Sequence, residues 1–292
     1  MRLLNASGCL DALAAPGVAR QLDAYVTKTI TPLPREGNAP PRIAETAHGM
    51  LNAIGLANPG RERFVSHTLP RLTELLDIPI WVSVGGFSAD DYAETCAGLD
   101  RDAVAVIELN LSCPNVDEAA DGAAEIVAAC RAVTAIPLYA KLSAAHPDVA
   151  AVATAVADAG ADGLSLINTL RGSALDPRTL QPVLARTTGG LSGPSLKPIA
   201  LATVHACYAA THLPIVGMGG VTTGQDALEL VACGARDVAL GTILFSDPDA
   251  PSRVRAELAD ASARVGVAGP DEAHAVAHDP ERTPLRERSV TA

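Results

Sequence analysis

The segment AVAVIELNLSCPN, residues 103–115, leads from an apolar run into a cluster of reactive side chains. Residues 103–107 are all apolar, which predicts a β-strand. The side chains that follow are two amides, a hydroxyl and a thiol, with a proline between them: Asn110, Ser112, Cys113, Pro114 and Asn115. Because α/β folds build active sites at the carboxyl ends of parallel strands, the segment predicts an α/β fold and the place of its site. A thiol there can serve as a nucleophile, a metal ligand or a proton-transfer base.

The rest of the chain repeats this alternation of apolar strand and helix. Besides residues 104–111, seven short runs predict strands, at 3–6, 25–29, 80–84, 138–142, 163–167, 215–218 and 238–242. Alanine-rich stretches such as 123–133, 149–159 and 224–232 predict helices between them. This order implies parallel strands, and eight units favour a closed (β/α)8 TIM barrel over an open doubly wound sheet, the structural alternative.

Composition sets the size and class of the protein. The chain has 292 residues, 48% of them hydrophobic, which fits one barrel of roughly 250 residues. We expect residues 1–265 to form this single domain and the charged tail 266–292 to pack peripherally or fray. The net charge of −11 argues against nucleic acid or a membrane surface as a partner. No apolar stretch approaches the length of about 20 residues that spans a bilayer, so we expect a cytoplasmic protein.

Six cysteines are scattered through the chain, at Cys9, Cys96, Cys113, Cys130, Cys207 and Cys233. They form no CxxC pair and no cluster with histidine, so disulfides and a zinc site are both weakly supported. Five of them are expected to pack as small apolar residues. A core position is also the ordinary alternative for Cys113.

Polar or glycine residues stand at or near the carboxyl ends of the predicted strands. In chain order they are Ser7 and Gly8, Lys28, Gly85 and Gly86, Asn110 to Cys113, Lys141, Asn168 and Thr169, Gly219 and Gly220, and Gly241 and Thr242. So many at one end predict a ring of functional groups around one barrel mouth. The long connections 31–59 and 171–198 belong to the same face, where loops of this length are usually functional or disordered.

The types of these residues indicate an anionic ligand. Glycines after the last two strands let backbone N–H groups approach a phosphate, although tight turns are the alternative. Lys28 and Lys141 are costly in strands unless they are paired or face a ligand, and a salt bridge across the mouth is their alternative. The glycines and lysines together suggest FMN. The amides of Asn52, Asn110, Asn115 and Asn168 suggest a small, planar, anionic substrate beside it.

At this point the motifs resemble those of class 1 dihydroorotate dehydrogenases. NLSCPN at 110–115 is similar to the catalytic segment of that family. Six further segments match in order: TKTIT (27–31), REGN (35–38), NAIGLANPG (52–60), NTLRG (168–172), GGLSGP (189–194) and GMGG (217–220). The resemblance covers roughly residues 3–260. Its details favour class 1B, whose members work with a separate iron–sulfur flavoprotein, over the membrane-associated relatives with a serine base.

The resemblance implies a role for each matched residue. Cys113 would be the base that removes the C5 proton of dihydroorotate while the C6 hydride passes to N5 of FMN. The implied substrate-binding residues are Lys28, Asn52, Gly55, Leu56, Asn110, Asn115, Asn168 and Thr169. The implied cofactor-binding residues are Ser7, Gly8, Lys28, Asn110, Lys141, Gly193, Gly219, Gly220, Gly241 and Thr242. No metal is implied in this chain, because its cysteines lack iron–sulfur spacing.

The resemblance also implies partner subunits, and two alternative functions stay open beside it. It implies a homodimer, or a heterotetramer with an iron–sulfur and FAD-containing electron-transfer subunit. A related dehydrogenase acting on another dihydropyrimidine such as dihydrouracil is the first alternative, although histidine rather than Asn115 is expected there. A non-catalytic barrel is the second. Two departures from the family pattern stand near the site: Ala144 and Ala145 replace an expected Pro-Asn pair, and His48 replaces a proline or small residue.

Overall fold

A computed structural model describes residues 1–111, 120–279 and 281. Its main sheet consists of β1 (Leu3–Asn5), β2 (Tyr25–Val26), β5 (Ile80–Val84), β6 (Val106–Asn110), β7 (Leu138–Leu142), β8 (Gly163–Leu166), β11 (Ile215–Met218) and β12 (Asp237–Leu240). The strands are parallel and run in the order β1-β12-β11-β8-β7-β6-β5-β2. A single parallel bridge between Leu4 and Ala24 joins the two end strands. The predicted (β/α)8 barrel is therefore confirmed.

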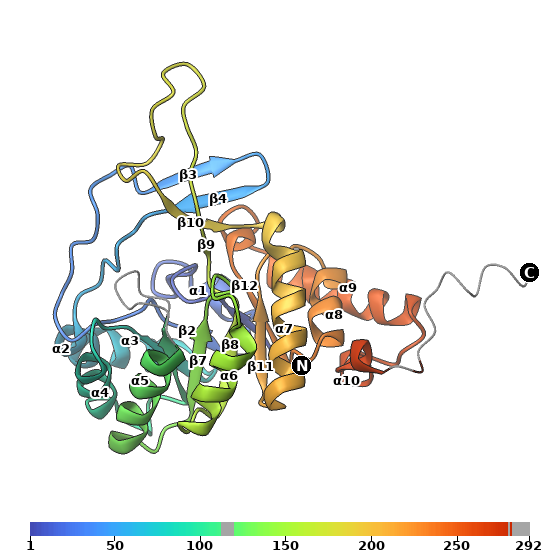
Figure 1. The fold of residues 1–292 in the computed structure, drawn as a ribbon, viewed down its shortest axis with the longest axis horizontal. Helices are drawn as coiled ribbons and strands as arrows, with labels where there is room; N and C mark the ends of the chain where they lie inside the picture. Colours follow the sequence, from blue (N-terminus) through green and yellow to red (C-terminus); the bar gives the residue numbers. More distant parts are fainter. Residues whose placement is uncertain (112–119, 280, 282–292) are drawn as a thin grey trace, which may run out of the picture.

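Helices connect the strands and cover the barrel (Figure 1). They are α1 (Pro16–Ala19), α2 (Arg61–Arg63), α3 (Leu69–Leu75), α4 (Ala89–Ala97), α5 (Ala120–Val133), α6 (Val149–Asp158), α7 (Lys197–Thr211), α8 (Gly224–Ala232) and α9 (Ala250–Arg264). Polar side chains cap the amino-terminal ends of three of these helices. Ser88 caps α4, Asp148 caps α6, and Thr223 with Asp226 forms a capping box on α8. The expected helices at 123–133, 149–159 and 224–232 correspond to α5, α6 and α8.

Large side chains fill the barrel near the amino-terminal ends of its strands. The rings of Trp81 and Tyr139 pack with centroids 4.8 Å apart. A Cβ at position 163 would overlap the Tyr139 ring, which explains the glycine at the start of β8. Leu4, Val106 and Val216 belong to the same buried cluster. Because this layer is closed, the inward positions nearer the carboxyl ends are left for the site.

The two long connections meet in a second sheet. Its strands β3 (Ile43–Thr46), β4 (Gly49–Asn52), β10 (Gly189–Ser192) and β9 (Leu170–Gly172) are antiparallel, in the order β3-β4-β10-β9. This small sheet stands beyond one end of the barrel (Figure 1). Both connections were expected on this face, but their strands were not predicted from the sequence. β10 begins with two glycines, Gly189 and Gly190. Because glycine is depleted in strands, the sequence did not indicate a strand there.

The last described residues pack against the outside of the barrel. Ala273, in α10 (Pro270–Ala273), is buried, and the Ala275 N–H donates to the Val231 carbonyl at 3.0 Å. The ring of His278 stacks on that of His205 of α7. The predicted domain boundary at residue 265 stays a prediction. Among the described residues, no helix combines the length and apolar character needed to cross a membrane.

Candidate functional site at the barrel mouth

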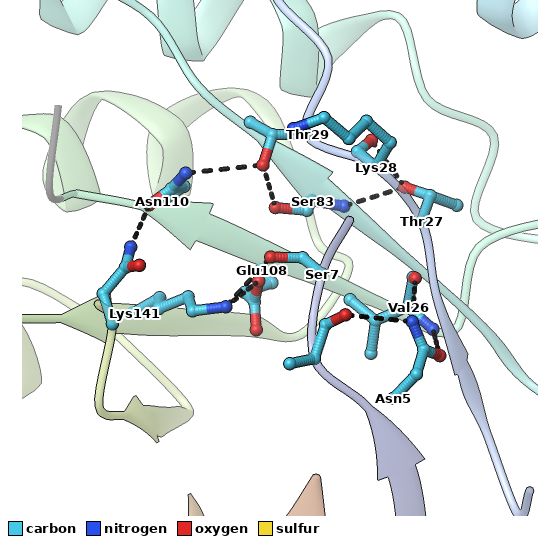
Figure 2. A network of polar contacts seen from close by, with 12 residues as sticks. Asn5, Ser7, Val26, Thr27, Lys28, Thr29, Ser83, Glu108, Asn110 and Lys141 are labelled. Atoms are coloured by element: carbon cyan, nitrogen blue, oxygen red, sulfur yellow. Dashed lines mark hydrogen bonds and ion pairs between the residues drawn. The ribbon is translucent and has the colours of Figure 1, made fainter. Parts of the chain in front are cut away.

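Lys28 and Lys141 lie on either side of Ser7, which stands in the turn that follows β1 (Figure 2). The Lys141 ammonium donates to Ser7 Oγ at 2.9 Å and forms an ion pair with Glu108 Oε1 at 3.4 Å. The Lys28 side chain packs on the turn itself, since a Cβ at Gly8 would lie 3.0 Å from Lys28 Cδ. The structure therefore brings Ser7, Gly8, Lys28 and Lys141 together, as their positions at strand ends predicted.

The charge of Lys28 is not neutralised within the site. Lys28 has no carboxylate within ion-pair distance among the residues that the structure describes. Burial lowers its pKa, the neighbouring Cys9 acts to raise it, and the charge of Lys141 lowers it further. Burial also raises the pKa of the Cys9 thiol, against the influence of the two lysines. The site thus holds an excess of positive charge in poor contact with water, an arrangement suited to an anion.

A row of amides and hydroxyls runs from the segment after β2, across the end of β6, to the segment after β8. Asn110 Nδ2 donates to Thr29 Oγ1 at 3.4 Å, and Asn110 Oδ1 accepts from Asn168 Nδ2 at 2.8 Å. Thr29 Oγ1 is 2.9 Å from Ser83 Oγ, so the row is anchored on buried hydroxyls (Figure 2). The Tyr92 hydroxyl holds the Asn110 carbonyl at 2.6 Å. These contacts fix the orientation of both amides, which is what recognition of a planar polar ring requires.

The second sheet extends this row toward Asn52. Asn52 Nδ2 donates to the Gly190 carbonyl at 3.3 Å, and a Cβ at Gly190 would overlap the Thr169 hydroxyl. The Thr169 N–H in turn donates to Asn168 Oδ1 at 2.7 Å. Asn52, Thr169, Asn168 and Asn110 therefore form one continuous set. Gly190 is required for it, because any larger residue would separate Asn52 from Thr169.

The predicted phosphate-binding glycines gather at another part of the mouth. A Cβ at Gly220 would lie 2.8 Å from the Lys197 N and 3.1 Å from the Gly193 carbonyl, and Thr242 Oγ1 donates to Ser192 Oγ at 2.8 Å. Gly193, Gly219 and Gly220 all have positive φ, at 108°, 117° and 78°. Within the described part of the chain, the N–H groups of Gly219, Gly220 and Gly241 donate to no protein acceptor. Free N–H groups from converging turns can bind a phosphate.

Some predicted site residues stand apart or cannot be placed. Gly55 and Leu56 lie in the loop after β4, where a Cβ at Gly55 would lie 2.7 Å from the Asn38 N and Leu56 accepts from Asn58. Among the described residues, no hydrogen bond joins this loop to the asparagine row. Cys113 and Asn115 lie outside the described residues, so their roles stay predictions. His48 lies in the β3–β4 turn, where its carbonyl accepts from the Ser195 N–H at 3.4 Å.

Three polar residues of the mouth were not predicted from the sequence. Glu108, 1% exposed, is the ion-pair partner of Lys141. Thr29 and Ser83 support Asn110. A signal was present for Glu108, because a lone carboxylate in an apolar strand is as costly as the lysines that were noticed. No group of three or more metal-binding side chains is found in the described residues.

Comparisons with known proteins agree with this geometry. The family model described as dihydroorotate dehydrogenase matches residues 2–261. A protein of Latilactobacillus sakei is 45% identical over 274 residues, 90% of this chain and 89% of its own. Two Listeria monocytogenes proteins, of serotype 4a and serovar 1/2a, are 44% and 47% identical over 85% and 78% of this chain and over 84% and 77% of their own. All three relatives are named dihydroorotate dehydrogenase B (NAD(+)), catalytic subunit.

Proposed function

The chain belongs to the dihydroorotate dehydrogenase family, and we propose that it oxidises (S)-dihydroorotate to orotate in pyrimidine biosynthesis with FMN as cofactor. One observation carries the proposal: the two lysines at the Ser7 and Gly8 turn and the amide row from Asn110 to Asn52 share one barrel mouth. The first group suits an anionic ring, and the second suits a planar substrate with amide and carboxylate groups.

Several features of the mouth fit FMN. The N–H groups of Gly219, Gly220 and Gly241 have no protein acceptor among the described residues and would hold the phosphate and ribityl chain, with Gly193 and Thr242 beside them. Among the described residues, a Cβ at Gly241 would meet Ala6 Cβ at 3.7 Å and Cys9 Sγ at 3.8 Å and nothing nearer, so these residues leave room there. Ser7, Gly8, Asn110 and the two lysines would contact the ring.

When bound, FMN supplies a two-electron acceptor for the hydride that leaves C6 of the substrate. The Cys113 thiolate would take the proton from C5, so that the C5–C6 double bond of orotate forms as both leave. Asn52, Asn110, Asn115, Asn168 and Thr169 would hold the ring and carboxylate, and Lys28 would lie between substrate and cofactor. Because an ordinary thiol has a pKa of about 8.5, a thiol base favours activity in the alkaline range.

The direct test is anaerobic. Protein purified with FMN is mixed with dihydroorotate, and the bleaching of flavin absorbance is followed. We expect reduction by dihydroorotate and none by dihydrouracil, and we expect orotate rather than uracil to perturb the flavin spectrum. A protein that binds no FMN, or whose flavin dihydrouracil reduces equally well, would overturn the proposal.

The identity of the base has its own test. C113A is expected to bind FMN like the parent but to reduce the flavin with dihydroorotate about 10²- to 10⁴-fold more slowly, the range lost with a general base. C233A is the control, since Cys233 lies at the end of α8, next to His278. Flavin reduction at the parental rate in C113A would exclude Cys113 as the base.

The names of the relatives as catalytic subunits suggest a second subunit. We propose that electrons leave the reduced flavin through an iron–sulfur, FAD-containing partner, and that the catalytic chain itself forms a dimer. Reoxidation of the reduced protein by NAD together with the partner, by fumarate and by a quinone is compared. Efficient reoxidation by fumarate alone would contradict the partner proposal.

A further inference from the structure

Glu108 and Lys141 form a buried ion pair just inside the barrel mouth (Figure 2). Their side chains are 2% and 4% exposed, and they project from the neighbouring strands β6 and β7. Removing two charges from water is costly, and replacing such a pair by apolar residues is often neutral or stabilising. A contribution to the stability of the barrel is therefore not enough to explain why Glu108 and Lys141 are both buried here.

A second pair at the opposite end of the barrel shows how a structural ion pair is built here. Asp237 accepts from Arg2 three times, from the backbone N–H at 2.8 Å, from Nε at 3.1 Å and from Nη2 at 2.6 Å. By contrast, Glu108 receives one contact, at 3.4 Å, from the described residues. Lys141 uses two of its three donors, on Ser7 and Glu108. The mouth pair is thus left with hydrogen-bonding capacity that the described protein does not use.

A third group beside the pair is also unused. Ser165 on β8 is in register with Lys141 on β7, so the two side chains leave the sheet on the same face. Ser165 is fully buried, and its hydroxyl has no hydrogen-bond partner among the described residues. Buried hydroxyls without partners are uncommon in native proteins and point to a ligand or an ordered water. The free donor of Lys141 and the free hydroxyl of Ser165 therefore lie on adjacent strands.

We propose that Glu108 is a positioning residue of the flavin site: its carboxylate holds the Lys141 ammonium against the flavin ring, and through that ammonium the site binds reduced flavin more tightly than oxidised flavin. This inference rests on the proposed function. A positive charge beside the ring stabilises the anionic reduced form. A buried ammonium next to the charge of Lys28 needs a counter-charge to hold it in place. Glu108 is the only carboxylate within ion-pair distance of Lys141 in the described chain.

The test measures the midpoint potential of bound FMN in a spectrophotometric redox titration with a reference dye. E108Q is expected to lower the preference for reduced over oxidised FMN at least tenfold, which is about 30 mV for a two-electron couple. D237N is the matched control, because it removes a buried carboxylate from the ion pair at the other end of the barrel. It is expected to lower the melting temperature without changing the potential.

A double variant decides whether Glu108 acts through Lys141. K141Q should lower the preference for reduced FMN at least tenfold in the parent and less than threefold in E108Q. An unchanged or raised potential in E108Q, or an equal effect of K141Q in both backgrounds, would overturn the inference. If the parent and D237N bind no FMN, the proposed function itself fails. If the parent and D237N bind FMN with the same midpoint potential and E108Q also has that potential, the proposed role of Glu108 is wrong but the proposed function stands.

Discussion

The side chain of Asn5 hydrogen-bonds both backbone groups of Val26, accepting from the N–H at 2.9 Å and donating to the carbonyl at 2.7 Å (Figure 2). Asn5 is the last residue of β1, and Val26 is the last residue of β2. These two strands share one backbone bridge, between Leu4 and Ala24. The Asn5 amide therefore replaces a missing part of the ladder and closes the barrel next to the lysines.

Removal of the Asn5 amide is expected to weaken the seam, the junction between β1 and β2 at which the barrel closes. N5A leaves a buried N–H and a buried carbonyl of Val26 without partners, and each such group costs about 1–3 kcal/mol. We expect the melting temperature of the FMN-free protein to fall by several degrees. N38A is the comparison, since Asn38 donates one hydrogen bond to Ala53 in a half-buried loop outside the barrel. Equal stability of N5A and N38A would contradict the role of Asn5.

Gly241 is expected to matter more for FMN affinity than for the stability of the fold. Around its Cβ position no atom of the described residues lies closer than 3.7 Å, so the G241A methyl group clashes with none of them. A methyl group there would occupy the space proposed for the FMN phosphate and ribityl chain. We expect FMN affinity to fall at least tenfold in a fluorescence titration. G17A is the control, because a Cβ at Gly17 in α1 meets no atom within 4 Å in the part of the chain that the structure describes.

The main barrel was predictable from sequence because burial on both faces leaves each parallel strand as an apolar run. The seam was not, because nothing in the letters around Asn5 says that its amide pairs with Val26 rather than with solvent. β10 was missed for a related reason. Gly189 and Gly190 are poor strand residues, but the absence of a side chain at Gly190 is what admits Thr169.

The site was predictable in its composition and less so in its contacts. Residues at strand ends, such as Lys141 and Asn110, could be located because parallel strands converge at one mouth. Their partners lie on other strands, and barrel register decides which side chains meet. Glu108 carried a signal as a lone carboxylate in an apolar strand, but its pairing with Lys141 and the contact of Ser83 with Thr29 became visible only with that register. The chemical roles of Cys113 and Asn115, which lie outside the described residues, stay predictions.

Asp226 is expected to stabilise the turn after β11 above about pH 4 and to lose this effect in acid. Burial acts to raise its pKa, but hydrogen bonds from Lys197 and Thr222 outweigh burial and lower the pKa to about 2. A carboxyl whose pKa is lowered on folding contributes stability that is complete above its unfolded pKa of about 3.9 and is lost as the pH falls through about 2. The parent should therefore melt at a higher temperature than D226N above about pH 4, and the difference should shrink toward pH 2. D260N, a change of an exposed carboxylate on α9, is expected to show no such pH-dependent difference.

Lys28 is expected to make orotate binding depend on pH. Burial lowers the pKa of Lys28, Cys9 acts to raise it, and Lys141 lowers it further, so the amine becomes neutral at a lower pH than an exposed lysine does. An anionic ligand prefers the protonated amine. Orotate affinity should therefore fall as the pH rises from about 6 to about 10, a range that ends near the ordinary lysine pKa of about 10.4. The measurement is a spectral titration of FMN-loaded C113A, in which the titration of the Cys113 thiol cannot contribute. K28M in that background should bind orotate more weakly at pH 6 and show a flatter pH profile. A parental fall in affinity that persists in K28M would assign the pH dependence to a group other than Lys28.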